Sequence, residues 1–199
     1  MRIGIYGGTF DPPHIGHIEA FKSFLNSFDF DKAFVIPVYL PPHKNVHSAS
    51  TVDDRLNMTR IAFENMGENV FVSDVEIKRQ GKSYTADTIA YFKNEGYDDI
   101  YFLCGTDMIL TLDMWYKPDY IFENATIVYV RRESDLVNTQ RIDIKVKEYE
   151  KRFGARIIPL STEVIEVSST EIRQRAASGD YSYLTEGIKR YIIEGRLYS

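Results

Sequence analysis

The sequence has little of three features that would tie it to a particular class of protein. Cysteine occurs once, at Cys104, which excludes an internal disulfide and a thiol-based zinc site and fits a reducing compartment. Positive charge is not in excess, because 24 lysines and arginines face 29 aspartates and glutamates. The resulting net charge of −5 argues against a general nucleic-acid-binding surface.

Long hydrophobic runs are also missing. No apolar stretch approaches the ~18 residues of a membrane span, and the apolar run near Met1 is too short for a signal peptide. We therefore expect a cytoplasmic protein that has neither a membrane nor a nucleic acid as its partner.

What is present suits a folded domain. The 199 residues are 44% hydrophobic and 14% aromatic, which is ample material for one core, and we find no internal repeat or low-complexity segment. We expect a single domain over residues 1–199, with a helical appendage at about residues 168–199.

Predicted strands and helices alternate along the chain. The predicted strands are residues 2–6, 33–38, 70–75, 100–104, 126–130 and 156–160. The predicted helices lie around residues 18–28, 55–66, 85–95, 107–115, 118–122, 142–153, 169–177 and 186–194. Because several strands are apolar throughout, the pattern predicts an α/β fold with a doubly wound, Rossmann-like parallel sheet and helices on both faces. Ligands of such sheets bind at the carboxyl ends of the strands.

The first candidate site, called here the first motif, is residues 7–17 with the sequence GGTFDPPHIGH, directly after the first strand. Gly7 and Gly8 allow the backbone to come close to a ligand, and Gly16 does so at the start of a helix, where N–H groups favour anions. His14 and His17 are three residues apart, so they share a helix face and can donate hydrogen bonds to phosphate.

Other interpretations of the first motif are weaker. One such histidine alone is as often a surface or capping residue, and two histidines without a nearby carboxylate or cysteine make an incomplete zinc site. The motif lacks the G-x-G-x-x-G of dinucleotide-binding folds and the G-x-x-x-x-G-K-[ST] of P-loop enzymes. Neither a dehydrogenase nor an ordinary NTPase is indicated.

The second motif is residues 167–173, VSSTEIR. Ser168 and Glu171 form a capping-box pattern, so a helix is expected to start here and to offer N–H groups with the hydroxyls of Ser169 and Thr170. Arg173 lies one turn further on and can add a bidentate clamp on an anion. Taken alone, the segment would more often be an ordinary capped helix with a solvated arginine.

Both motifs resemble those of the nucleotidyltransferase superfamily, in which a nucleoside monophosphate passes from a nucleoside triphosphate to a substrate phosphate. The first motif resembles its G-x-F-D-x-x-H-x-G-H signature, and the second resembles the S-[ST]-T-x-[IL]-R segment that grips the β- and γ-phosphates of ATP. The resemblance also implies Mg²⁺ as a cofactor, held mostly by substrate oxygens without a protein cage.

Three further segments resemble the bacterial nicotinate-mononucleotide adenylyltransferases. Pro41-Pro42-His43-Lys44 resembles their P-x-H-K loop near the acceptor phosphate, and Ser83-Tyr84-Thr85-Ala86-Asp87-Thr88 their S-Y-T-x-D-T segment at the nicotinate carboxylate. Gly105-Thr106-Asp107 followed by Trp115 resembles their G-x-D, for nucleotide hydroxyls, and their Trp, for stacking on the pyridine ring; Thr106 stands where Ala is commoner.

This resemblance implies an enzyme of NAD biosynthesis that joins ATP and nicotinate mononucleotide to give nicotinate adenine dinucleotide and pyrophosphate. The implied catalytic residues are His14, His17, Lys44 and Arg173, which would supply positive charge. The implied ATP-binding residues are Gly7, Gly8, Thr9, Phe10, His17, Gly105, Asp107, Ser168, Ser169, Thr170 and Arg173. The implied nicotinate-mononucleotide-binding residues are Thr9, His43, Lys44, Tyr84, Thr85 and Trp115.

Alternatives stay open. The P-x-H-K loop is otherwise a turn with exposed charges, Thr85 is also expected to cap a helix, and a lone Trp115 is most often core. The second enzyme candidate is phosphopantetheine adenylyltransferase, which shares the first motif but is shorter and lacks the Ser83-to-Thr88 segment. A non-catalytic nucleotide-binding module of the same fold is the third candidate, and the sequence leaves open whether the chain forms a homo-oligomer.

Overall fold

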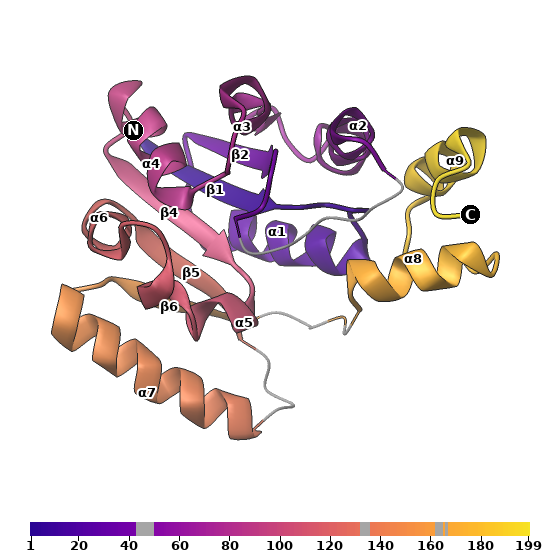
Figure 1. Cartoon of the computed structure of the whole chain (residues 1–199). Coiled ribbons are helices and arrows are strands. Elements are labelled where there is room, and N and C mark those ends of the chain that lie inside the picture. Colours follow the sequence, from indigo (N-terminus) through magenta and orange to yellow (C-terminus); the bar gives the residue numbers. More distant parts are fainter. Residues whose placement is uncertain (43–49, 132–135, 162–164, 166) are drawn as a thin grey trace.

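A six-stranded parallel sheet forms the centre of the molecule in the computed structural model, which describes the chain except residues 43–49, 132–135, 162–164 and 166 (Figure 1). The strands are β1 Arg2–Gly8, β2 Lys32–Pro37, β3 Val70–Val72, β4 Asp99–Cys104, β5 Thr126–Arg131 and β6 Ile157–Ser161. Their order is β3-β2-β1-β4-β5-β6, and every neighbouring pair is parallel. The predicted doubly wound α/β fold is confirmed.

Helices connect the strands along the described chain. They are α1 Ile15–Ser27, α2 Val52–Phe63, α3 Val75–Arg79, α4 Thr85–Asn94, α5 Thr106–Ile109, the 3₁₀ helix η1 Leu112–Met114, α6 Pro118–Asn124, α7 Leu136–Phe153, α8 Ser169–Ala177 and α9 Glu186–Gly195. Within the described ranges, no helix has both the length and the apolar character needed to cross a membrane.

Four predicted elements differ from the structure. β1 continues through Gly7 and Gly8, because these two residues still pair with the end of β2. β3 ends at Val72, and α3, which sequence periodicity missed, follows it. The single helix expected over residues 107–115 is divided into α5 and η1, and α7 starts six residues earlier than expected.

Two apolar clusters cover the two faces of the sheet. Ile3 and Ile5 of β1 belong to the cluster under α4, α6 and α7, whereas Tyr6 belongs to the cluster with α1. This alternation follows from the two-residue period of a strand, and it explains why β1 is apolar on both sides. A third, smaller cluster joins α2 to α8 and α9, which Figure 1 shows together at one end of the domain.

The strand order reverses between β1 and β4. From β1 the chain adds β2 and β3 on one side, and it then returns to place β4, β5 and β6 on the other. The helices that leave these two central strands therefore diverge to opposite faces, which opens a crevice at their carboxyl ends. The first motif begins with the last two residues of β1, and Gly105 follows β4, so both predicted segments lie at this crevice.

Arg55 holds the edge of the crevice together. It is only 2% exposed, and its guanidinium donates to the carbonyls of Thr9 (3.0 Å), Val38 and Tyr39 (3.0 Å). These carbonyls lie just beyond β1 and β2, where the ladder of the sheet no longer satisfies them. The buried arginine therefore fixes two chain segments that line the candidate site.

We expect Arg55→Lys to lower the free energy of unfolding by about 2 kcal/mol. An ammonium group lacks the planar set of N–H donors of the guanidinium and leaves a buried carbonyl without a hydrogen bond. Urea denaturation followed by circular dichroism measures the change. Arg60→Lys is the matched control on the same helix. The side chain of Arg60 is 43% exposed, and its ion pair with Glu64, at 3.5 Å, lies at the protein surface. Equal effects of the two substitutions would contradict the role given to Arg55.

Candidate functional site

The first motif makes a tight turn around an aromatic ring. Phe10 is 1% exposed and has a φ of 50°, and a Cβ on Gly8 would lie 2.7 Å from its ring. Gly8 is therefore required by the packing of Phe10. Gly8 also lines the pocket described below, so the close approach of a ligand that its sequence context predicts stays a prediction beside this packing requirement. At Gly7 a Cβ would meet only the Phe102 ring, at an ordinary 3.6 Å.

His14 and His17 lie side by side, as their spacing predicts. His14 is the residue before α1, His17 is in its first turn, and their ring centroids are 3.7 Å apart. The backbone N–H of His14 donates to Nδ1 of His17 at 3.2 Å. A nitrogen that accepts a hydrogen bond carries no proton, so the proton of a neutral His17 is on Nε2.

Burial sets the charge of His14. The residue is 5% exposed, and the loss of solvent lowers its pKa to about 4, although Glu171 acts in the opposite direction. In the described chain its Nδ1 has no hydrogen-bond partner. Burial therefore favours the uncharged imidazole at neutral pH, whereas the sequence predicts that His14 supplies positive charge.

The N-terminus of α1 is covered by residues from the far end of the chain. The N–H of Ile15 donates to the carbonyl of Tyr183 at 3.0 Å, so it is not available to an anion. A Cβ on Gly16 would lie 3.2 Å from the carbonyl of Ile165. Gly16 thus permits the segment before α8 to approach α1, which brings the second motif next to the first.

Direct hydrogen bonds join the two motifs. Arg173 donates through Nη1 to the carbonyl of Asp11 at 2.7 Å and through Nη2 to the hydroxyl of Thr170 at 3.1 Å. Ser169 donates to the carbonyl of Pro12 at 3.0 Å. Two motifs more than 150 residues apart in the sequence therefore share one site, as their chemistry predicts.

The expected capping box at the start of α8 is only half formed. The hydroxyl of Ser168 accepts the N–H of Glu171 at 3.1 Å, as predicted. The carboxylate of Glu171, however, accepts from Arg175 at 2.8 and 2.9 Å. The arginine one turn later competes for this carboxylate, and the reciprocal bond of a capping box is not made.

Asp11 is a central residue of the site that the sequence analysis did not single out. Its carboxylate, 3% exposed, accepts from the hydroxyls of Tyr198 (2.7 Å) and Ser50 (2.5 Å) and lies 3.7 Å from Arg173. Burial and the Asp11 charge raise the pKa of Tyr198, which stays a neutral donor. No local pattern could have revealed this, because Tyr198 is 187 residues away.

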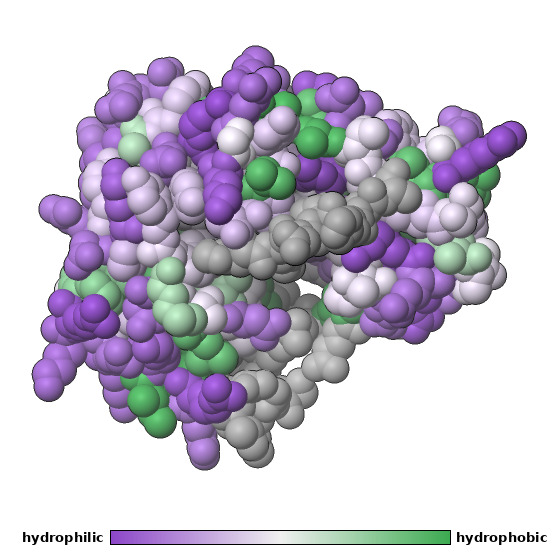
Figure 2. Space-filling model, viewed as in Figure 1, coloured by the Kyte–Doolittle hydropathy of each residue, from purple (hydrophilic) through white to green (hydrophobic). Residues whose placement is uncertain are grey.

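A pocket opens on the other side of the first motif, at the ends of β1 and β4. Its wall contains four residues predicted for the acceptor, Thr9, Tyr84, Thr85 and Trp115. The other lining residues are Ile5, Gly7, Gly8, Ile36, Val38, Pro41, Pro42, Glu76, Ser83, Thr88, Phe102, Met108 and Tyr116. Figure 2 shows one face of the molecule, which is mostly hydrophilic and is hollowed between the body of the sheet and α8.

The wall formed by α3 and α4 contains a buried carboxyl group. Glu76 is 5% exposed, accepts from the Thr88 hydroxyl at 2.6 Å, and has a pKa raised by burial, while its second oxygen has no partner in the described chain. The expectation that Thr85 caps α4 is wrong. The N-cap position is Tyr84, one residue earlier, and the Tyr84 side chain makes no capping hydrogen bond. The rings of Tyr84 and Tyr116 are 4.5 Å apart at the pocket wall.

The remaining predicted residues are less closely connected. Gly105 and Asp107 are exposed at the end of β4, at the same edge of the sheet as the first motif. His43 and Lys44 lie outside the described residues. Among the residues that the structure describes, no three His, Cys, Asp or Glu side chains are arranged to hold a metal ion.

Comparisons with known proteins concern the family and the fold of the chain. The model of the cytidylyltransferase-like family matches residues 5–175. A protein of Caldicellulosiruptor saccharolyticus is 32% identical over 100% of this chain and 99% of its own length, and one of Clostridium tetani is 37% identical over 88% and 87%. Both carry the name "probable nicotinate-nucleotide adenylyltransferase".

The fold is also that of solved structures. The Plasmodium falciparum nicotinic acid mononucleotide adenylyltransferase complexed with NaAD superimposes with a TM-score of 0.76, covering 99% of this chain and 97% of that one, at 20% identity. At this identity the likeness concerns the fold alone.

The lowered pKa of His14 predicts a pH-dependent stability. Between about 6.5, its ordinary pKa, and about 4, the unfolded chain binds a proton that the folded chain does not. The stabilisation from neutral His14 is therefore complete above this window and is lost as the pH falls through it. We expect the free energy of unfolding, from urea titrations, to fall less steeply in His14→Gln than in the unmodified protein. Parallel curves for the two proteins would contradict the burial effect.

Proposed function

The chain belongs to the cytidylyltransferase-like family and, within it, to the nicotinate-nucleotide adenylyltransferases, and we propose that it transfers the adenylyl group of ATP to nicotinate mononucleotide. The products would be nicotinate adenine dinucleotide and pyrophosphate. The observation that carries the proposal is the joining of the two motifs by Arg173 and Ser169, beside a pocket that contains the predicted acceptor residues.

The proposed reaction needs two substrates held in line more than it needs covalent chemistry. The phosphate of nicotinate mononucleotide attacks the α-phosphorus of ATP, a P–O bond forms, and pyrophosphate leaves. His17, with its proton on Nε2, would donate to the α-phosphate as charge builds there. Arg173, Ser169 and Thr170 would hold the β- and γ-phosphates, as in the superfamily motif that the segment resembles.

His14 has a different part in this proposal from the one its sequence suggests. As a buried neutral imidazole it can donate one hydrogen bond, but it brings no net charge to the phosphates. Positive charge would then come from Arg173 and, from outside the described residues, Lys44.

A divalent metal, Mg²⁺, fits the donor set of the site. Asp11 is buried and already accepts from two hydroxyls, whereas the guanidinium of Arg173 donates hydrogen bonds. Such residues suit a Mg²⁺ held by phosphate oxygens and water, which would neutralise charge on the triphosphate.

The acceptor ring would occupy the pocket next to the first motif. Trp115 would stack on the pyridine ring, and backbone N–H groups at the start of α4, near Tyr84 and Thr85, would meet the ring carboxylate. Among the described residues, the pocket walls are mostly apolar and aromatic, which suits a flat ring.

We expect His17→Ala to reduce kcat by about 10²–10³-fold with little change in ATP affinity, because an α-phosphate donor acts mainly in the transition state. Steady-state assays of pyrophosphate release and equilibrium titration with ATP measure the two effects. Lys22→Ala is the control on the same helix, since Lys22 pairs with Glu19 at the surface. Near-normal turnover of His17→Ala would exclude this residue from the role.

The choice of acceptor tests the proposed function itself. Pyrophosphate release from ATP is measured in parallel with nicotinate mononucleotide, nicotinamide mononucleotide and phosphopantetheine. We expect the acid to be preferred over the amide by at least ~10²-fold in kcat/KM, because N–H donors make a charge-assisted bond only with the carboxylate. Trp115→Ala should impair both pyridine nucleotides about equally.

Two results would count against these assignments. Equal use of the acid and the amide would contradict the role of the α4 N–H groups. Exclusive use of phosphopantetheine would overturn the proposed function.

A further inference from the structure

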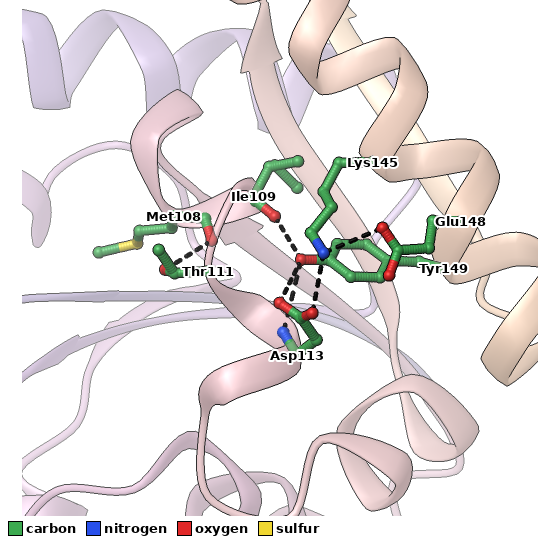
Figure 3. A network of polar contacts seen from close by, with 7 residues as sticks. All are labelled: Met108, Ile109, Thr111, Asp113, Lys145, Glu148 and Tyr149. Atoms are coloured by element: carbon green, nitrogen blue, oxygen red, sulfur yellow. Dashed lines mark hydrogen bonds and ion pairs between the residues drawn. The ribbon is translucent and has the colours of Figure 1, made fainter.

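A polar cluster lies between the α5–η1 segment and α7 (Figure 3). Met108 and Trp115, from the same stretch of chain as this segment, line the pocket. At its centre is Tyr149, whose side chain is fully buried. Its hydroxyl oxygen lies 2.9 Å from the carbonyl of Ile109 and 2.9 Å from the carboxylate of Asp113, and it accepts the N–H of Asp113 at 3.4 Å. One residue of α7 thus contacts the end of α5 and the middle of η1.

Lys145, one turn earlier on α7, completes the cluster. Its ammonium group donates to the second carboxylate oxygen of Asp113 at 2.8 Å and to Glu148 at 3.0 Å. Burial raises the pKa of Asp113, but hydrogen bonds from Lys145 and Tyr149 outweigh it, and the pKa lies below its ordinary value. Asp113 is therefore an ionised acceptor with two donors from α7.

The same short segment determines where Trp115 lies. The N–H of Trp115 donates to the carbonyl of Leu112 at 3.2 Å, and its Nε1 donates to the hydroxyl of Thr111 at 3.3 Å. Thr111 in turn donates to the carbonyl of Met108 at 3.2 Å. The indole is tied to the turn that Asp113 anchors, two residues before it.

We propose that Asp113, Lys145 and Tyr149 are positioning residues, which hold the α5–η1 segment so that Trp115 faces the acceptor ring. The inference rests on the proposed function, because it assigns the ring to the pocket. It gives α7 a role at the active site, although no residue of α7 lines the described pocket.

The division of the expected 107–115 helix supports this role. In a continuous helix each residue is rotated by about 100° about the axis from the one before it, which would fix the direction of residue 115. In the structure the chain instead turns at Thr111, and Trp115 ends η1 in extended backbone, at φ −75° and ψ 164°. The contacts of Tyr149 with Ile109 and Asp113 lie on either side of this turn. Loss of the anchor would allow the segment to vary without unfolding the sheet.

The test uses Asp113→Asn, Lys145→Met and Tyr149→Phe in the full chain. We expect each to raise the KM for nicotinate mononucleotide by about tenfold and to change the KM for ATP and kcat by less than about twofold, since stacking geometry affects acceptor binding first. Lys145→Arg should restore most of the loss. Lys147→Met is the matched control, because Lys147 is exposed on the same helix, and it should leave all three constants unchanged.

Trp115 is the one tryptophan of the chain, so its fluorescence reports on this segment without any substrate. In the three variants we expect a red-shifted emission and stronger quenching by acrylamide than in the unmodified protein and in Lys147→Met. A double variant Asp113→Asn/Lys145→Met should be no worse than the poorer single variant, because both changes remove the same contact.

Unchanged fluorescence and an unchanged acceptor KM in folded variants would overturn the proposal. Equal rises of both KM values would do so as well, because they would indicate a general effect on stability. If the proposed function fails, the unmodified protein shows no turnover with nicotinate mononucleotide, yet the ligand-free fluorescence shifts still test the positioning. The two failures are therefore distinguishable.

Discussion

The reversal of strand order between β1 and β4 is the constraint on which the rest of the structure depends. Two parallel strands side by side, with connections that leave in opposite directions, open a crevice at their carboxyl ends. The first motif and Gly105 lie there because the first motif begins at the end of β1 and Gly105 directly follows β4. The pocket lies on one side of this crevice, and the histidine pair lies on the other.

Buried polar contacts turn the crevice into a defined site. Asp11 links the first motif to Tyr198 and Arg173, while Arg55 donates hydrogen bonds to the carbonyls beyond β1 and β2. Groups of this kind are costly to bury unless they are paired, and each is paired with a segment distant in the sequence. These paired polar groups therefore stabilise one arrangement of the segments around the site.

The two halves of the site have different chemical characters. On the α1 side, the guanidinium of Arg173 and the buried imidazole of His14 lie at the place proposed for phosphate. On the α4 side, aromatic and apolar walls surround the place proposed for the ring. The α5–η1 segment forms part of the second half, and its contacts with α7 tie that half to the outer edge of the sheet.

The sequence by itself determined the alternation of strands and helices, and hence the parallel sheet, because periodicity and apolar runs are local properties. It also located the start of α8 and both motifs, since capping residues and loop glycines act on their neighbours. Only the tertiary structure decided that Gly8 accommodates Phe10, that His14 is buried with a lowered pKa, and that the 107–115 segment divides. It alone paired Asp11 with Tyr198, 187 residues away. Burial and such long-range contacts depend on how the elements pack, and no pattern along the chain encodes them locally.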